Sequence, residues 1–171
     1  MSISRAAGPR ARSLVLTAAG VALVATGGGL GYTVASAADP APVTVTRQSL
    51  SEVASPPGAK NRTLGLSKVV VMPGSVLAPH HHPGQQLGYI AEGVLTYTVQ
   101  TGKAKLMTGP GDDATKLQTI KPGDTVKVKP GQWLVEEQGE VHHAANNGTV
   151  PVVIYLATLF KTGEPAAIPD R

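Results

Sequence analysis

The hydrophobic and polar positions of this chain form an apolar N-terminal segment followed by many short runs of strand character. The runs are rich in alternating or β-branched residues and cover 43–47, 64–72, 76–82, 86–90, 94–100, 125–129, 132–135, 142–145 and 150–160. A period of two is typical of strands with one buried face. Pro-Gly pairs at 73–74, 83–84, 122–123 and 130–131 supply turns between them. Because no window after residue 38 keeps a helical period, the pattern predicts an all-β sandwich or barrel.

One region interrupts this series. Residues 102–118 are polar and contain several glycines, with Gly109-Pro110-Gly111 at their centre. We expect a long loop or a hairpin with an extended tip. It either covers the mouth of the barrel or projects from its periphery.

The composition fits one globular domain and limits the chemistry available to it. The chain has 171 residues, of which 42% are hydrophobic and 15% charged, enough for a packed core. It contains 20 glycines and 14 prolines, which suits many short strands joined by turns. It has no cysteine, so any metal would be held by nitrogen and oxygen atoms.

The N-terminal segment resembles an export signal in its layout. Residues 1–13 are polar and carry three arginines, residues 14–34 are apolar and uncharged, and Ala35-Ser36-Ala37 follows. A secretory signal peptide cut after Ala37 has this order. The apolar run is also long enough to serve as an uncleaved membrane anchor. In both cases we expect a secreted or cell-envelope protein.

The basic isoelectric point, about 9.5, depends largely on this segment. Three of the 15 basic residues lie within the first 12 positions, and no acidic residue precedes Asp39. The remaining 12 basic residues face 11 acidic ones. This balance excludes the basic stripe of a nucleic-acid-binding protein.

The five histidines occur in two clusters, which points to one shared site. His80, His81 and His82 lie in one predicted strand, and His142 and His143 lie in another. Alternate side chains of a strand share a face, so His80 and His82 point together while His81 points away. A His-x-His pair joined by a histidine from a second strand can hold a divalent metal such as Fe, Mn, Ni, Cu or Zn.

The spacing around these histidines resembles the two sequence motifs of the cupin superfamily. The first motif matches at Gly74, His80, His82, Gln86 and Gly93, and the second matches at Gly131, Gly139, His142 and Asn146. The similarity covers about residues 64–160 and is that of a small single-domain cupin of the type-2 conserved-barrel kind. It implies a jelly-roll β-barrel with one divalent metal bound by His80, His82, Gln86 and His142.

Two positions depart from the family pattern. Gln86 stands where the family has a glutamate, and an amide oxygen is a weaker, uncharged ligand. Gln86 would either bind the metal directly or hydrogen-bond to a water on it. A site of three histidines and a glutamine would keep the full charge of the metal and favour anionic substrates.

The second departure is Glu137, which replaces a proline and lies between Glu136 and Glu140. These carboxylates either decorate a solvated turn, the interpretation that we favour, or supply a charge behind the metal ligands. Glu137, Glu140 and Asn146 are the candidates for such supporting contacts. Four of the aromatic residues, Tyr89, Tyr97, Trp133 and Tyr155, are expected to pack in the core rather than to contact a substrate.

These observations predict four segments: a signal peptide or signal anchor (1–37), a linker with the first strand (38–63), a cupin barrel (64–160) and a C-terminal tail (161–171). The expected function is binding of one divalent metal with a small-molecule ligand or substrate in the barrel. As an enzyme, the protein would be an oxygenase, isomerase, decarboxylase or lyase. The alternative is an envelope module that binds or senses a ligand without turnover. A homodimer is plausible because barrel edge strands can pair.

Overall fold

The computed structural model describes residues 44–170, and its long elements are all β-strands. The strands of these residues are β1 (Val45–Ala54), β2 (Arg62–Val71), β3 (Val76–His81), β4 (Gly84–Glu92), β5 (Leu95–Thr101), β6 (Ala104–Thr108), β7 (Thr115–Ile120), β8 (Thr125–Val128), β9 (Gln132–Glu136), β10 (Val141–Ala145), β11 (Val152–Lys161) and β12 (Ile168–Pro169). A short 3₁₀ helix, η1 (Gly111–Asp113), separates β6 from β7. The prediction of an all-β fold is confirmed.

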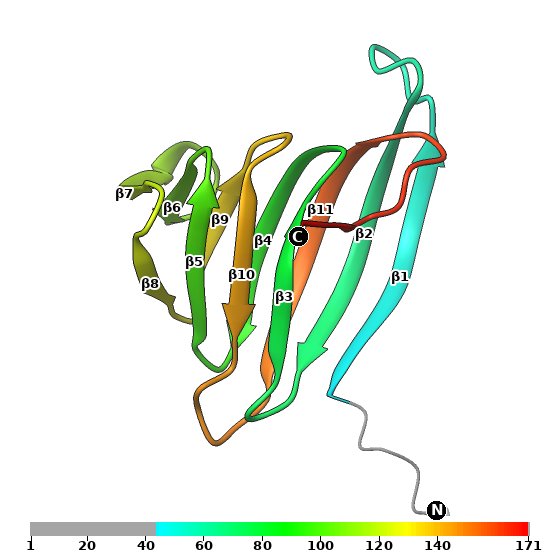
Figure 1. Ribbon diagram of the computed structural model, residues 1–171. Helices are drawn as coiled ribbons and strands as arrows, with labels where there is room; N and C mark the ends of the chain where they lie inside the picture. The colour runs from blue at the N-terminus through cyan, green and yellow to red at the C-terminus, as the bar shows by residue number, and fades with distance from the viewer. Residues whose placement is uncertain (1–43, 171) are drawn as a thin grey trace, which may run out of the picture. The chain divides into compact units, whose positions relative to one another are not determined.

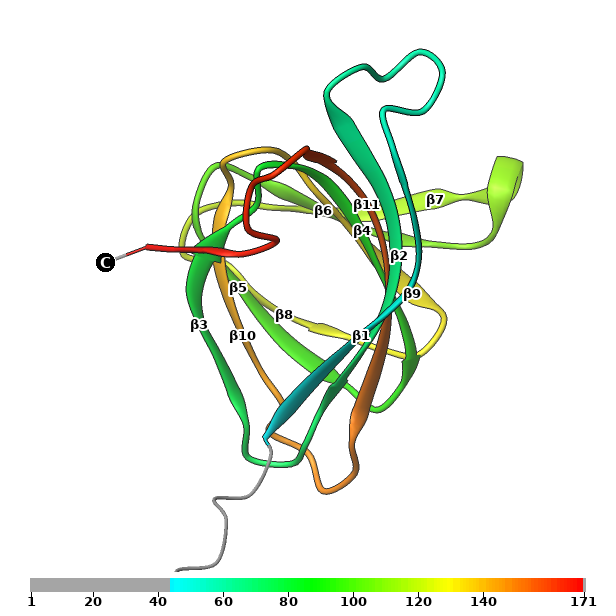
Figure 2. The same ribbon diagram turned by 90° about the vertical axis from the view of Figure 1, so that its right-hand side faces the viewer.

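The strands form two antiparallel sheets that wrap around a common interior (Figures 1 and 2). One sheet has the order β1-β2-β11-β4-β9-β6-β7, and the other has the order β12-β3-β10-β5-β8. Sequence neighbours are therefore often separated in space, as in a jelly roll. Among residues 44–170, no helix is long and apolar enough to cross a membrane. The predicted signal or anchor segment, 1–37, lies outside the described residues.

The alternation of side chains in β4 shows how the sequence builds the barrel wall. Gln86, Gly88 and Ile90 face the interior, whereas Leu87 and Tyr89 face outward with 38% and 46% of their surface exposed. β4 pairs with β11 on one side and β9 on the other, so its inward residues sit in the middle of the larger sheet. Tyr89 and Tyr155 are exposed on the outer face, so their expected place in the core is wrong.

The two segments that carry the histidines are joined directly by strand pairing. β3 and β10 are neighbours in the smaller sheet, and His142 is the register partner of His80. The Gly74 N–H donates to the Asn146 carbonyl at 2.8 Å, and the Gly139 N–H donates to the His82 carbonyl at 3.3 Å. The two sequence motifs are thus joined on both sides of the His80–His142 pair, which fixes the separation of these histidines.

Gly93 is required at the turn that follows β4. Its φ of +71° lies in the left-handed region, and a Cβ there would come within 2.6 Å of the Pro151 carbonyl oxygen. Any side chain would combine backbone strain with a clash against the segment before β11. This is a physical reason for the glycine that closes the first motif.

The polar region 102–118 is a hairpin with an extended tip. β6 and β7 pair with each other, η1 lies at the tip, and β6 also pairs with β9. The hairpin forms the far edge of the larger sheet, and none of its residues lines the barrel cavity. It is therefore a peripheral projection rather than a cover over the mouth (Figure 2).

Strand pairing extends beyond residues 64–160 at both ends. β1 pairs with β2 over its whole length, and β12 pairs with His80 and His81 of β3. β1 is exposed at every residue except Val45, so it lacks the hydrophobic period that would reveal its full length in the sequence. It is the outer strand of the larger sheet.

Candidate metal centre

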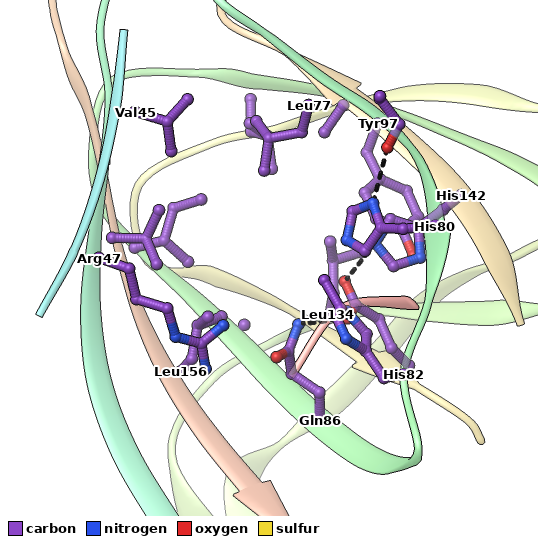
Figure 3. Close-up of a pocket in the computed structure, with 18 of the residues that line it drawn as sticks. Val45, Arg47, Leu77, His80, His82, Gln86, Tyr97, Leu134, His142 and Leu156 are labelled. Carbon is purple, nitrogen blue, oxygen red and sulfur yellow. Dashed lines mark hydrogen bonds and ion pairs between the residues drawn. The ribbon is translucent and has the colours of Figure 1, made fainter. Parts of the chain in front are cut away.

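Three imidazole rings converge inside the barrel (Figure 3). His80 and His142 come from paired strands, and His82 follows the end of β3. One ring nitrogen from each lies within 4.8 Å of the others. His82 and His142 are each only 3% exposed, while His80 is partly buried. The predicted grouping of these three histidines is therefore present.

Backbone carbonyls orient two of the rings. The Nδ1 of His80 lies 2.7 Å from the Ala78 carbonyl, and the Nδ1 of His82 lies 2.5 Å from the Ala166 carbonyl. A carbonyl only accepts hydrogen bonds, so each Nδ1 must carry a proton, and in the neutral ring Nε2 is then the atom with the lone pair. Metal-binding histidines are commonly held in this way. Both rings therefore present a metal-binding atom to the cluster.

His142 is oriented by a carboxylate and an aromatic ring. Its Nδ1 lies 3.3 Å from Glu140 Oε2, outside hydrogen-bonding geometry, and its ring stacks on Tyr97 at a centroid distance of 4.8 Å. The Tyr97 hydroxyl donates to both Glu140 oxygens, at 2.9 and 3.1 Å. Burial and the nearby carboxylates raise the pKa of Tyr97 well above 10, so the hydroxyl keeps its proton. Tyr97, at the face of the ring, and Glu140, beside Nδ1, thus contact His142 and restrict its orientation.

A buried carboxylate, Glu136, also faces the histidines. Its Oε2 lies 3.3 Å from His82 Nε2, and its Oε1 lies 3.9 Å from His142 Nε2. Gln86, its register partner on β4, donates from Nε2 to Glu136 Oε2 at 2.6 Å. Burial raises the pKa of Glu136, but His142, His82 and the Gln86 hydrogen bond outweigh it and lower the value to about 2. Glu136 is therefore ionised near neutral pH.

The imidazoles differ in their proton affinity. Burial lowers the pKa of His80, and the neighbouring His142 and His82 add to this effect. Burial also opposes the charged form of His142, but Glu136 and Glu140 outweigh it, so the pKa of His142 is raised. A proton is thus bound more readily by His142, which lies beside the carboxylates, than by His80.

Other candidate residues lie elsewhere or act differently. Glu137 points outward, is 44% exposed and lies 3.5 Å from Lys105 Nζ. The interpretation of the three carboxylates as solvated is correct for Glu137 and wrong for Glu136 and Glu140, which are 4% and 2% exposed. Asn146 is fully buried and hydrogen-bonds to Val71, Val150 and Gly148, so its role is structural.

The two remaining histidines point away from the cluster, as expected. His81 Nδ1 lies 2.6 Å from Asp170 Oδ2, and His143 Nδ1 lies 3.4 Å from Gln100 Nε2. Neither residue lines the barrel cavity. The alternation of a β-strand therefore separates His81 from its two neighbours as predicted.

Sequence reasoning favoured a solvated turn for Glu136 and did not include it among the candidates for supporting contacts. The predicted strand 132–135 ended one residue too early, whereas β9 includes Glu136. In the extended strand, Glu136 shares the inward face of Leu134. A glutamate at an inward strand position is itself a signal of a functional site, because a buried carboxylate needs a partner.

The cluster forms one wall of a cavity of about 340 Å³ within the barrel. Most of the lining is apolar and comes from both sheets, including Val69, Leu77, Ile90, Leu95, Leu134, Ile154 and Leu156. Arg47 of β1 enters from the wall opposite the histidines (Figure 3). The cavity therefore combines a polar wall that carries the three histidines, apolar sides and one cationic group.

A family model described as Cupin matches residues 35–170, which is most of the chain. The chain belongs to the cupin family. No curated protein sequence matches this cupin significantly.

Solved structures with similar folds share little sequence with this cupin. A conserved protein of unknown function from Streptococcus pyogenes has 16% identity and a TM-score of 0.45, over 68% of this chain and 74% of that one. A cupin 2 conserved barrel domain protein from Leptotrichia buccalis has 21% identity and a TM-score of 0.45, over 67% and 40%. The Schizosaccharomyces pombe Cnp3 cupin domain has 13% identity and a TM-score of 0.48, over 71% and 68%. These similarities concern the fold alone.

The residues present in this cupin fit a divalent metal. Three imidazole nitrogens and a carboxylate form a nitrogen and oxygen donor set that suits first-row transition metals and zinc. The buried carboxylate would also be matched in charge by a cation. The donor set does not select one metal among Fe, Mn, Ni, Cu and Zn.

Proposed function

We propose that this protein is an exported cupin that holds one divalent metal ion and binds a small molecule beside it in the barrel. The observation that carries the proposal is the convergence of His80, His82 and His142, with two of the rings fixed so that Nε2 faces the cluster. A divalent ion bound there would supply Lewis-acid chemistry to a ligand in the cavity. The protein supplies the orientation of the ligands and an apolar enclosure.

Metal content tests this proposal. We expect about one equivalent of metal in the full chain purified without a polyhistidine tag, measured by elemental analysis. His80→Ala and His142→Ala should each lose that metal while far-UV circular dichroism shows a folded barrel. His143→Ala is the matched control, because its ring points away from the cavity. Metal content unchanged in His80→Ala would contradict the assignment.

The ligand that the cavity supports best has an apolar body and an anionic group. The cavity sides are largely aliphatic, and Arg47 lines it without an ion-pair partner among residues 44–170. Partial burial lowers the pKa of Arg47, but a guanidinium remains charged at neutral pH. A carboxylate in the ligand would provide the missing partner.

Octanoate is a suitable probe of this selectivity. Titration calorimetry should detect octanoate binding and little binding of 1-octanol, because the alcohol offers no charge to Arg47. Arg47→Gln should weaken octanoate binding by about tenfold or more, whereas Lys116→Gln, an exposed cation on β7, should leave it unchanged. Equal binding of the acid and the alcohol would refute the anionic preference.

A binding or sensing module without turnover is the second candidate. Among residues 44–170, those that line the cavity include no serine, threonine, cysteine or lysine, so none of these described side chains offers covalent catalysis there. Binding of a ligand without its consumption, and without oxygen uptake, would support this role. Metal-dependent conversion of the bound ligand would support an oxygenase, isomerase, decarboxylase or lyase instead.

Export and oligomeric state are further parts of the proposal. The arginines, apolar run and Ala35-Ser36-Ala37 support export, with cleavage after Ala37 or retention as an anchor. Mass spectrometry of the protein recovered from cells should give Ala38 as its first residue if the signal is cleaved. The exposed outer strand β1 supports a homodimer formed through strand edges, which light scattering would detect.

A further inference from the structure

We propose that Glu136 is the carboxylate ligand of the metal centre, in place of the glutamate that the cupin pattern puts at position 86. This inference rests on the proposed function, because it requires that the three histidines bind a metal. The two positions face each other across the β4–β9 ladder, where Gln86 and Glu136 are register partners. In this chain the carboxylate thus lies on the neighbouring strand β9 instead of β4, and it still faces the inner surface of the barrel.

The distance from Glu136 to His82 agrees with two donors that share one ion, and the distance to His142 is slightly longer. Metal–ligand bonds of about 2.1 Å separate neighbouring donors by roughly 3.0–3.5 Å in octahedral or tetrahedral geometry. Glu136 Oε2 lies 3.3 Å from His82 Nε2, and Glu136 Oε1 lies 3.9 Å from His142 Nε2. The three histidines already form a group within 4.8 Å, and the carboxylate would join it by moving about half an ångström toward His142.

The orientation of Gln86 argues against the amide as the oxygen ligand. Its Nε2 faces the cluster, donating to Glu136 Oε2 at 2.6 Å and lying 3.1 Å from His82 Nε2. An amide NH₂ group has no lone pair for a metal. The Gln86 Oε1 atom is buried without a hydrogen-bond partner among the described residues. Gln86 therefore acts as a positioning residue that holds the carboxylate in place.

The charge of the centre supports the same assignment. Glu136 is 4% exposed and has no lysine or arginine within ion-pair distance among residues 44–170. Its only ion-pair contacts there are the two histidines, which a metal would require to be neutral. A divalent ion would supply the cation that the buried carboxylate then lacks. With Glu136 as a ligand, the centre would carry one net positive charge. With the neutral Gln86 in its place, it would carry two.

Metal affinity in matched variants tests the inference. Zn²⁺ competition against a chromophoric chelator should give Glu136→Gln an affinity about 100-fold or more below that of the wild type, beyond the usual cost of losing a supporting contact. Glu137→Gln, one residue along the chain and exposed beside Lys105, should bind Zn²⁺ as the wild type does. Co²⁺ absorption spectra should also change in Glu136→Gln and not in Glu137→Gln.

The swapped double variant Gln86→Glu/Glu136→Gln provides the decisive comparison. It keeps the carboxylate–amide pair and its hydrogen bond, so it should fold, and it returns the carboxylate to position 86. We expect its Zn²⁺ affinity to lie within about tenfold of the wild type, well above that of Glu136→Gln. The inference is overturned if Glu136→Gln binds Zn²⁺ within threefold of the wild type, or if the double variant is no better than Glu136→Gln.

The inference and the proposed function fail in distinguishable ways. Zn²⁺ binding that is lost in His80→Ala but kept in Glu136→Gln would refute the role of Glu136 and leave the metal-binding function intact. A wild-type protein that binds no Zn²⁺ or Co²⁺ would overturn both. We expect Zn²⁺ affinity to be lost in both His80→Ala and Glu136→Gln. The swapped double variant should recover the affinity that Glu136→Gln loses.

Discussion

At the scale of single residues, the candidate centre depends on groups behind the ligands as much as on the ligands. His80 and His82 are fixed by carbonyl groups, whereas His142 depends on the carboxylate of Glu140 and the ring of Tyr97. Each of these contacts restricts ring rotation before a ligand arrives. The site is therefore pre-organised by neighbours from four different strands or turns.

Tyr97→Phe tests the support behind His142. The variant keeps the stacked ring but removes the hydroxyl that donates to both Glu140 oxygens, leaving a buried carboxylate less well satisfied. Urea unfolding should show a loss of about 1.5–3 kcal/mol in the free energy of unfolding. Tyr155→Phe is the control, because Tyr155 lies on the outer face with 38% exposure. Equal stability of the two variants would show that the hydrogen bonds contribute nothing.

At the scale of elements, one buried asparagine joins three segments of the barrel. Asn146 follows β10, and its amide nitrogen donates to the Val71 and Val150 carbonyls at 2.8 Å each. Its side-chain oxygen accepts from the Gly148 N–H at 3.0 Å. The turn between β10 and β11 is thus attached to the end of β2.

Asn146→Ala should destabilise the barrel strongly. It removes three hydrogen bonds from a fully buried side chain, at a cost of about 3 kcal/mol. The thermal midpoint should fall accordingly, while zinc affinity in the folded protein stays close to that of the wild type. Asn147→Ala, which loses one exposed bond to Thr96, is the control. A large loss of metal affinity at unchanged stability would contradict the structural role.

Strands in which buried and exposed side chains alternate could be predicted from the sequence. Strands and residues without that alternation could not. Alternation and the two motifs were enough to bring His80, His82 and His142 together, because strand geometry fixes which residues share a face. β1 has no buried period beyond Val45, so its length could not be predicted. Glu136 was assigned to a solvated turn because a polar residue at a strand end resembles the start of a turn. The partners of each carboxylate depend on tertiary packing, which spacing does not contain.

At the scale of the whole molecule, metal binding should raise the stability of the barrel without being required for its folding. The histidines are placed by strand pairing and by backbone hydrogen bonds between the two motifs, and none of these contacts uses a ring nitrogen that a metal would occupy. The barrel should therefore stay folded without metal. Zn²⁺ at 100 times its dissociation constant should stabilise it by about 2.7 kcal/mol.

Chelation tests this coupling. Adding EDTA to the Zn²⁺-loaded protein should lower the thermal midpoint to that of His80→Ala in EDTA, with unchanged far-UV circular dichroism at room temperature. His80→Ala itself should show no shift on addition of Zn²⁺. Unfolding of the wild type by EDTA at room temperature would contradict the view that the barrel forms independently of the ion.

The most direct test of a metal centre at the three histidines is anomalous diffraction from crystals of the protein grown with Zn²⁺, measured on both sides of the zinc absorption edge. The account predicts one strong peak inside the barrel, at about 2.1 Å from the Nε2 atoms of His80, His82 and His142. No peak between these rings, or a peak only at surface sites such as His143, would contradict it.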